Sequence, residues 1–130
     1  MKKLAMLFVI SLFSLSAWAL QNDIKTAIEG HTFEWRWSEG AFKGAAFNVT
    51  FKQDGELAWK GIEGLVVGKG DIEKEYVVKS ISENVKLISW SEKSGYTVTI
   101  VLNFENGLCT GVVSKGQEWY PLSGRFSRVN

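Results

Sequence analysis

Two runs of alternating apolar and polar residues flank a glycine turn in the segment ISWSEKSGYTVTIVLNFENG, residues 88–107. Such alternation is typical of β-strands that bury one face. A three-residue loop over 93–95, with a glycine bulge, keeps the apolar residues of both strands on the same face. The pairs that this loop predicts are Ile88 with Ile100, Trp90 with Val98, and Glu92 with Tyr96. The segment therefore predicts an antiparallel hairpin that carries one carboxylate on its apolar face.

The same alternation recurs through most of the chain. A three-residue loop over 53–55 pairs Phe51 with Leu57 and Val49 with Trp59, whereas a two-residue loop would place these partners on opposite faces. The pattern as a whole predicts strands near 31–38, 44–52, 56–61, 73–81, 84–92, 96–104, 108–114 and 118–127.

A third turn, over residues 105–107, allows two registers. A three-residue loop turns Leu108, Thr110 and Val112 inward. A two-residue Asn-Gly loop instead turns Cys109, Gly111 and Val113 inward. We favour the three-residue loop.

These strands predict an all-β fold. No long helices separate the strands, which disfavours parallel βαβ architecture. Consecutive hairpins indicate a single antiparallel up-and-down β-barrel of about eight strands, because closure removes exposed sheet edges. A short helix is expected over 24–29, between a capping Asn22-Asp23 and Gly30. A β-sandwich is the alternative fold.

Composition excludes several classes of protein. The chain has 130 residues, which is the length of a single domain. Its net charge of +1 is much less positive than that of a typical small nucleic-acid-binding protein. One cysteine and one histidine exclude an intramolecular disulfide and a Cys/His zinc site. Cys109 is expected to be buried, since an exposed free thiol invites dimerisation. We expect neither a metal site nor a cofactor.

The N-terminus has the features of a secretory signal. A basic Met1-Lys2-Lys3 precedes a mostly apolar run over 4–15, and Ala17-Trp18-Ala19 offers the small-x-small pattern that signal peptidase cleaves. The apolar run is well short of the roughly 20 residues that a membrane-spanning helix needs. We expect a signal peptide over 1–19, cleavage near Ala19, and a periplasmic or secreted domain over 20–130 with no membrane span.

The abundance of tryptophan suggests a cavity as well as a core, because a small barrel can be packed with fewer rings. By face parity and hairpin register, the predicted ligand-binding residues are Trp35, Trp37, Trp59, Trp90, Glu92, Tyr96 and His31. Glu92 is expected at the barrel rim, where it either lies against aromatic rings that would raise the pKa of its carboxyl or points to water or a backbone group. His31 shares the face of Trp35 and Trp37 and is a second polar candidate, although a lone histidine at the start of a strand is more often a solvated or hydrogen-bonded terminus.

A glycine-rich segment, GIEGLVVGKG over 61–70, is similar to a phosphate-binding loop only superficially. No Ser or Thr follows Lys69 and no helix is predicted after it. We interpret the segment as a turn and bulge at the barrel mouth. Its Leu65-Val66-Val67 would be unusual if left in water, so this loop could contact a protein partner.

Residues 88–107 also resemble the core hairpin of the MoaF-like domain. In that family a Ser-Trp-x-Glu strand leads through a glycine turn into a Thr-Val-Thr strand. Gly124-Arg125-Phe126 is similar to the family's closing strand, and Gly30-His31-Thr32-Phe33 to its opening one. The resemblance covers most of 30–128. It implies a calycin, or lipocalin-like, barrel related in fold to bacterial phenolic acid decarboxylases, without implying a reaction.

Together these features favour a protein that binds a small apolar or aromatic molecule over an enzyme. One alternative is a cofactor-independent, decarboxylase-like enzyme, which would need tyrosine and arginine beside Glu92, although strand alternation sends Arg36 outward. The other is a periplasmic inhibitor or protein-interaction module acting through the loop over 62–70.

Overall fold

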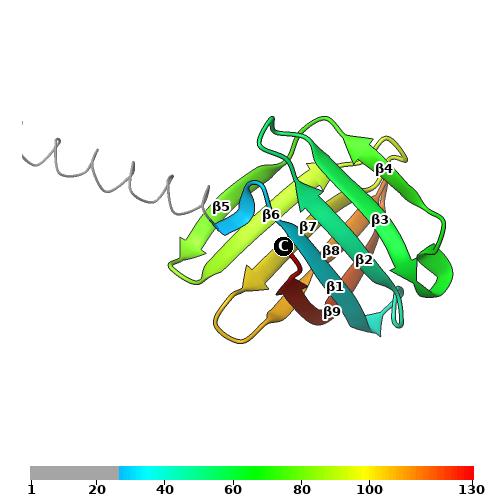
Figure 1. Cartoon of the computed structure of the whole chain (residues 1–130). Helices are drawn as coiled ribbons and strands as arrows, with labels where there is room; N and C mark the ends of the chain where they lie inside the picture. Colours follow the sequence, from blue (N-terminus) through cyan, green and yellow to red (C-terminus); the bar gives the residue numbers. More distant parts are fainter. Residues whose placement is uncertain (1–26) are drawn as a thin grey trace, which may run out of the picture.

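The computed structural model describes residues 27–130, which form one antiparallel sheet of nine strands (Figure 1). The order of strands across the sheet is β4-β3-β2-β1-β9-β8-β7-β6-β5. Each neighbouring pair is consecutive in the chain except β1 and β9, whose pairing joins the two halves. The elements are β1 (Thr32–Gly40), β2 (Ala46–Phe51), β3 (Leu57–Glu63), the short 3-10 helix η1 (Gly64–Val66), β4 (Gly70–Glu73), β5 (Val77–Ser82), β6 (Val85–Ser91), β7 (Thr97–Asn103), β8 (Leu108–Lys115) and β9 (Glu118–Arg128).

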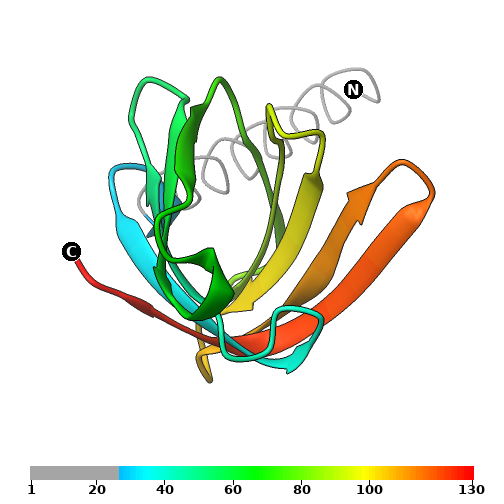
Figure 2. The same cartoon turned by 90° about the vertical axis from the view of Figure 1, so that its right-hand side faces the viewer.

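The sheet curls into a half-barrel (Figure 2), and the side chains buried inside it are mostly apolar. On β1 the alternation buries Phe33, Trp35 and Trp37 and leaves Arg36 exposed. At the start of β1, Phe33 packs edge-on against Phe104, with ring centroids 5.9 Å apart. This end of the interior is filled by four phenylalanines, Phe33, Phe51, Phe104 and Phe126. The remaining interior, toward the end of β1, holds the candidate site.

The expected all-β meander is confirmed, but the strand expected over 73–81 and the closure of the sheet differ from expectation. The strand expected over 73–81 is broken into β4, which pairs only with β3, and β5, which pairs only with β6. Within residues 27–130 the two edge strands form no ladder with each other, although only 74–76 separate them in the chain. The physical reason is burial: Glu73 points inward at the break, and the chain changes partner there.

Two of the predicted hairpin registers are confirmed. Phe51 lies opposite Leu57 in the β2–β3 hairpin, and Trp90 lies opposite Val98 in the β6–β7 hairpin. Gly95 has a φ of 95°, a conformation that residues with a side chain rarely adopt. The residues of the turn and the alternation of the strands favour the same register in both hairpins. Both registers could therefore be predicted from residues close in the chain.

The favoured register of the third turn was wrong. Cys109 lies opposite Leu102 and is buried, together with Val113, whereas Leu108 and Val112 are exposed. The turn is a four-residue loop over 104–107, which has the same parity as the rejected two-residue loop. The prediction that the unpaired thiol of Cys109 is buried is confirmed.

Asparagine side chains explain the length of this loop. Asn103 Oδ1 accepts a hydrogen bond from the backbone N–H of Glu105 at 3.0 Å, and Asn106 Oδ1 accepts one from Leu108 at 3.0 Å. The N–H of Gly107 donates to the carbonyl of Asn103 at 2.9 Å. These bonds stabilise the longer loop, since asparagine side chains readily satisfy backbone groups in turns.

Two predictions concern the N-terminus. The signal peptide over 1–19 lies outside the described residues. The short helix expected over 24–29 lies mostly outside them and is not supported as an element: of its residues that are described, Ala27 and Ile28 are helical and Glu29 lies in the turn that follows. Across 27–130, none of the helices has the length and apolar character needed to cross a bilayer.

Candidate functional site

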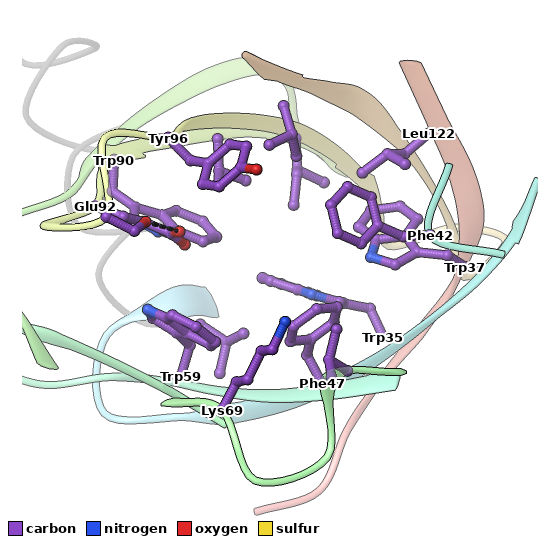
Figure 3. A pocket seen from close by; sticks show the side chains of 16 residues that line it. Trp35, Trp37, Phe42, Phe47, Trp59, Lys69, Trp90, Glu92, Tyr96 and Leu122 are labelled. Atoms are coloured by element: carbon purple, nitrogen blue, oxygen red, sulfur yellow. Dashed lines mark hydrogen bonds between the residues drawn. The ribbon is translucent and has the colours of Figure 1, made fainter. Parts of the chain in front are cut away.

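A cavity of about 270 Å³ occupies the interior beyond the phenylalanine cluster (Figure 3). Its walls are mostly aromatic and aliphatic, and Lys69 and Glu92 are the charged side chains that line it. The lining residues are Trp35, Trp37, Phe42, Phe47, Val49, Trp59, Val66, Lys69, Trp90, Glu92, Ser94, Tyr96, Val98, Ile100, Val113 and Leu122. A cavity of about 150 Å³ can hold benzene, so this one has room for about two fused rings.

Strand alternation places the tryptophans in the walls. Trp35 and Trp37 come from the inward face of β1, and Trp90 comes from the inward face of β6. The rings of Trp35 and Trp90 are nearly parallel, with centroids 6.1 Å apart. Trp59, on β3, packs edge-on against Phe47 at 6.1 Å. The contact between Trp35 and Trp90 therefore joins aromatic side chains from the two halves of the sheet.

Glu92 follows β6 directly and lies at the turn into β7. Its carboxylate accepts hydrogen bonds from Trp90 Nε1 at 3.2 Å and from Ser94 Oγ at 3.1 Å. Burial raises the pKa of Glu92 above the ordinary carboxyl value, and the nearby charges of Glu73 and Asp71 add to this effect. The two hydrogen bonds oppose the increase. The side chain can therefore accept hydrogen bonds from a ligand, or hold a proton more readily than an exposed glutamate.

Glu73 joins the two edges of the sheet behind this wall. Its side chain is only 2% exposed. One carboxylate oxygen accepts from Trp59 Nε1 at 3.2 Å, and the other accepts from the backbone N–H of Lys93 at 3.0 Å. Because Trp59 belongs to β3 and Lys93 to the β6–β7 turn, this residue bridges the gap that the missing ladder leaves. Sequence parity did not identify it, since it lies at the end of a strand expected to be continuous.

A second hollow, of about 440 Å³, lies along this gap. Its lining includes Glu73, Tyr76 and the exposed side chains of the segment that joins β4 to β5. Trp90 and Glu92 line both this hollow and the interior cavity. The wall between the two spaces is therefore thin at these two residues.

The structure brings six of the seven predicted site residues around the cavity: Trp35, Trp37, Trp59, Trp90, Glu92 and Tyr96. Tyr96 also lies beneath Lys115, whose Nζ is 4.8 Å from the ring centroid. Whether these residues bind a ligand stays a prediction.

His31 lies elsewhere. It precedes β1, on the side of the phenylalanine cluster, and its Nδ1 is 3.1 Å from the carbonyl oxygen of Asn130. Its ring packs edge-on against Phe33, with centroids 6.5 Å apart. Parity placed His31 on the correct face, but it could not show that the cavity begins further along the strand.

Lys69 was not predicted as a site residue. It follows η1 in the glycine-rich segment, and Figure 3 shows its side chain reaching from this loop into the cavity. Phe42, from the β1–β2 turn, also contributes to the wall. The available signal was the position of the segment at the mouth, which the sequence did suggest. The direction of a lysine side chain in an irregular loop has no periodic pattern from which it could be predicted.

Two apolar residues of this loop, Leu65 and Val67, are strongly exposed. Leu65 is 92% exposed and Val67 is 61% exposed, while Val66 between them is buried and lines the cavity. Within residues 27–130, no group of three or more histidine, cysteine or acidic side chains is arranged to hold a metal ion.

Comparisons with known proteins support the fold. The model of a family described as MoaF-like matches residues 26–127. A crystal structure described as "a putative beta-lactamase from Burkholderia vietnamiensis" is similar, with a TM-score of 0.68 and 20% sequence identity, over 78% of this chain and 94% of that chain. No curated protein matches. At this identity the similarity concerns the fold and carries no activity with it.

Proposed function

The chain belongs to the MoaF-like family, and we propose that it is an exported, calycin-like binding protein for a small, partly apolar or aromatic molecule. The observation that carries the proposal is the cavity, which is large enough for about two fused rings and walled by four indoles. Pockets with apolar walls and a few convergent polar groups are the usual form of a small-molecule site. Glu92 is the proposed polar anchor, since its carboxylate lines the same space.

Two substitutions on neighbouring residues of β8, one facing the cavity and one facing outward, test the proposal. Val113 lines the cavity from β8, whereas its neighbour Val112 is 39% exposed on the outer face. We expect Val113→Trp to fill the cavity and weaken binding of 2-naphthamide, a neutral two-ring probe, by tenfold or more in calorimetric titration. Val112→Trp is the matched control and should bind like the wild type.

Native mass spectrometry of the protein purified without denaturation provides a second readout. A co-purifying mass that is lost on unfolding, and absent from Val113→Trp, is the expected result. If no mass is retained, and 2-naphthamide binds neither the wild type nor Val112→Trp, the proposal is contradicted.

The decarboxylase-like alternative is less well supported by the geometry. It needs an arginine near the carboxylate, but Arg36 is exposed on the outer face, where it pairs with Glu34 and Glu63. Tyr96 is the cavity tyrosine that such a mechanism would have to use. Absence of turnover of hydroxycinnamate-like acids by the purified protein is the expected outcome.

The protein-interaction alternative has one specific observation in its favour. Leu65 and Val67 lie exposed on the loop beside the cavity mouth. A protein partner that covers them would bury apolar surface that water now contacts. A Leu65→Ser, Val67→Ser variant separates the two functions, because it should retain 2-naphthamide binding and lose only contacts made through the loop.

A further inference from the structure

We infer that the ligand carries a carboxylate, held by the indole N–H groups of Trp35 and Trp37 and the ammonium group of Lys69. The inference rests on the proposed function and narrows it to one class, aromatic carboxylates. It follows from the hydrogen-bond donors of the side chains that line the cavity. Some of these donors have no acceptor among the described residues.

The four cavity tryptophans divide into two pairs. The indole N–H groups of Trp59 and Trp90 donate to Glu73 and Glu92. Those of Trp35 and Trp37 donate to no acceptor within residues 27–130, although the two side chains are only 2% and 4% exposed. A buried donor without an acceptor is costly, so such groups normally have a partner.

These two indole nitrogens are not enclosed by protein atoms. Among the described residues, one side-chain nitrogen or oxygen is fully enclosed by protein and has no hydrogen-bond partner, and that atom is Asn48 Oδ1. Trp35 and Trp37 both line the cavity, and neither indole nitrogen is among those enclosed atoms. In Figure 3 the nitrogen of Trp35 lies toward the middle of the open space. A ligand acceptor is the group that would satisfy them.

Lys69 adds a positive charge to this donor set. It lines the cavity and forms no ion pair with an acidic side chain of the described chain, in contrast to Lys93, which pairs with Asp71 at 3.1 Å. Figure 3 shows Lys69 extending into the cavity from the loop that follows η1. A cation next to open N–H donors favours an anionic acceptor, because hydrogen bonds to a charged group are the stronger ones.

The position of Glu92 indicates the orientation of the ligand in the cavity. Both of its oxygens already accept hydrogen bonds, from Trp90 and Ser94, and it lines a different wall from Lys69. A ligand anion is therefore expected at Lys69, with the aromatic body between the indoles. A ligand ammonium group would meet Lys69, and a wholly apolar ligand would leave the N–H groups of Trp35 and Trp37 without an acceptor.

Three probes of nearly equal shape test the inference: 2-naphthoate, neutral 2-naphthamide and protonated 2-naphthylmethylamine. We expect calorimetric titration of the purified protein at pH 7.5 to give at least tenfold tighter binding of the carboxylate than of the amide, and weakest binding of the amine. Lys69→Met should reduce the carboxylate preference by fivefold or more, with the amide affinity unchanged within about threefold. Lys60→Met, at an exposed site outside the cavity, is the charge-matched control and should retain the preference.

Trp35→Phe removes the N–H group and keeps a ring, so it should also reduce the preference for the carboxylate; a thermal melt establishes that this variant is folded. If the amide or the amine binds as tightly as the carboxylate, the inference is overturned and the proposed function stands. If none of the three binds, both are overturned. If Lys69→Met keeps the full preference, Lys69 is not the anion's partner and the inference fails.

Discussion

At the scale of single residues, Glu92 has a carboxyl whose protonation depends on its buried surroundings. Burial raises the pKa of its carboxyl, and the acceptor bonds from Trp90 and Ser94 moderate the increase. A carboxyl whose pKa is higher in the folded state than in the unfolded state contributes stability that is complete below the unfolded value. This contribution is lost as the pH rises through the folded value.

We therefore expect Glu92→Gln, which cannot ionise, to gain stability relative to the wild type as the pH is raised from about 4 to 7. Urea unfolding of both proteins at each pH measures the difference. Glu75→Gln, at an exposed residue, is the control for loss of a surface charge. A difference between Glu92→Gln and wild type that shrinks with rising pH would contradict the assigned direction.

Cys109 is the second residue with a strongly shifted equilibrium. Its side chain is 3% exposed, and burial raises the pKa of its thiol to about 12. The thiolate is the reactive form, so the native thiol should be inert. We expect no modification by iodoacetamide at about pH 8 in the folded protein and complete modification in urea, measured by mass. Rapid labelling of the folded protein would show that β8 opens at this position.

At the scale of the elements, β7 and β8 approach each other at Gly111. A methyl group there would lie 2.1 Å from the carbonyl oxygen of Thr99 and 2.8 Å from Cα of Ile100. Both contacts are with backbone atoms, which cannot turn aside as a side chain can. The two strands therefore need a residue without a side chain at this point.

We expect Gly111→Ala to lower the free energy of unfolding by about 3 kcal/mol, as overpacking typically does. Val112→Ala, at the adjacent outward position, should lower it by less than about 1 kcal/mol. Chemical denaturation of the two variants makes the comparison. Equal effects would mean that the strands separate easily and that the close approach does not limit stability.

At the scale of the whole molecule, Glu73 links the two edges of the curled sheet across the gap between them. The carboxylate bridges Trp59 on β3 and the backbone of Lys93 in the β6–β7 turn. Replacing it removes the acceptor from two partly buried hydrogen bonds, and a donor left unsatisfied costs about 1–3 kcal/mol where it is buried. The neighbouring Asp71 also contacts Lys93, but through an exposed ion pair.

We expect Glu73→Ala to lower the free energy of unfolding by about 3 kcal/mol in urea denaturation. Asp71→Ala should have little effect, because exposed ion pairs are screened by solvent. Hydrogen exchange at the backbone N–H of Lys93 provides a local readout and should accelerate only in the Glu73 variant. If the two variants behave alike, the bridge does not hold the edges together.

Much of the fold could be predicted because its information is local. The alternation on β1, β6 and β7, and the glycine turns at 53–55 and 93–95, determine which side chains face inward. This parity is why six of the predicted site residues meet around one cavity. The loop over 104–107 was the local failure, since two asparagines stabilise a length that parity alone did not select.

The sequence by itself determined the all-β class, two hairpin registers and the inward aromatic face, because periodicity and turn chemistry act between residues close in the chain. Only the tertiary structure decided that the strand expected over 73–81 breaks, that Glu73 bridges the open edges, that Lys69 enters the cavity and that His31 lies away from it. Those outcomes depend on how far the sheet curls, which sets the distance between residues remote in sequence. The curl results from the packing of the whole interior, and no short segment encodes it.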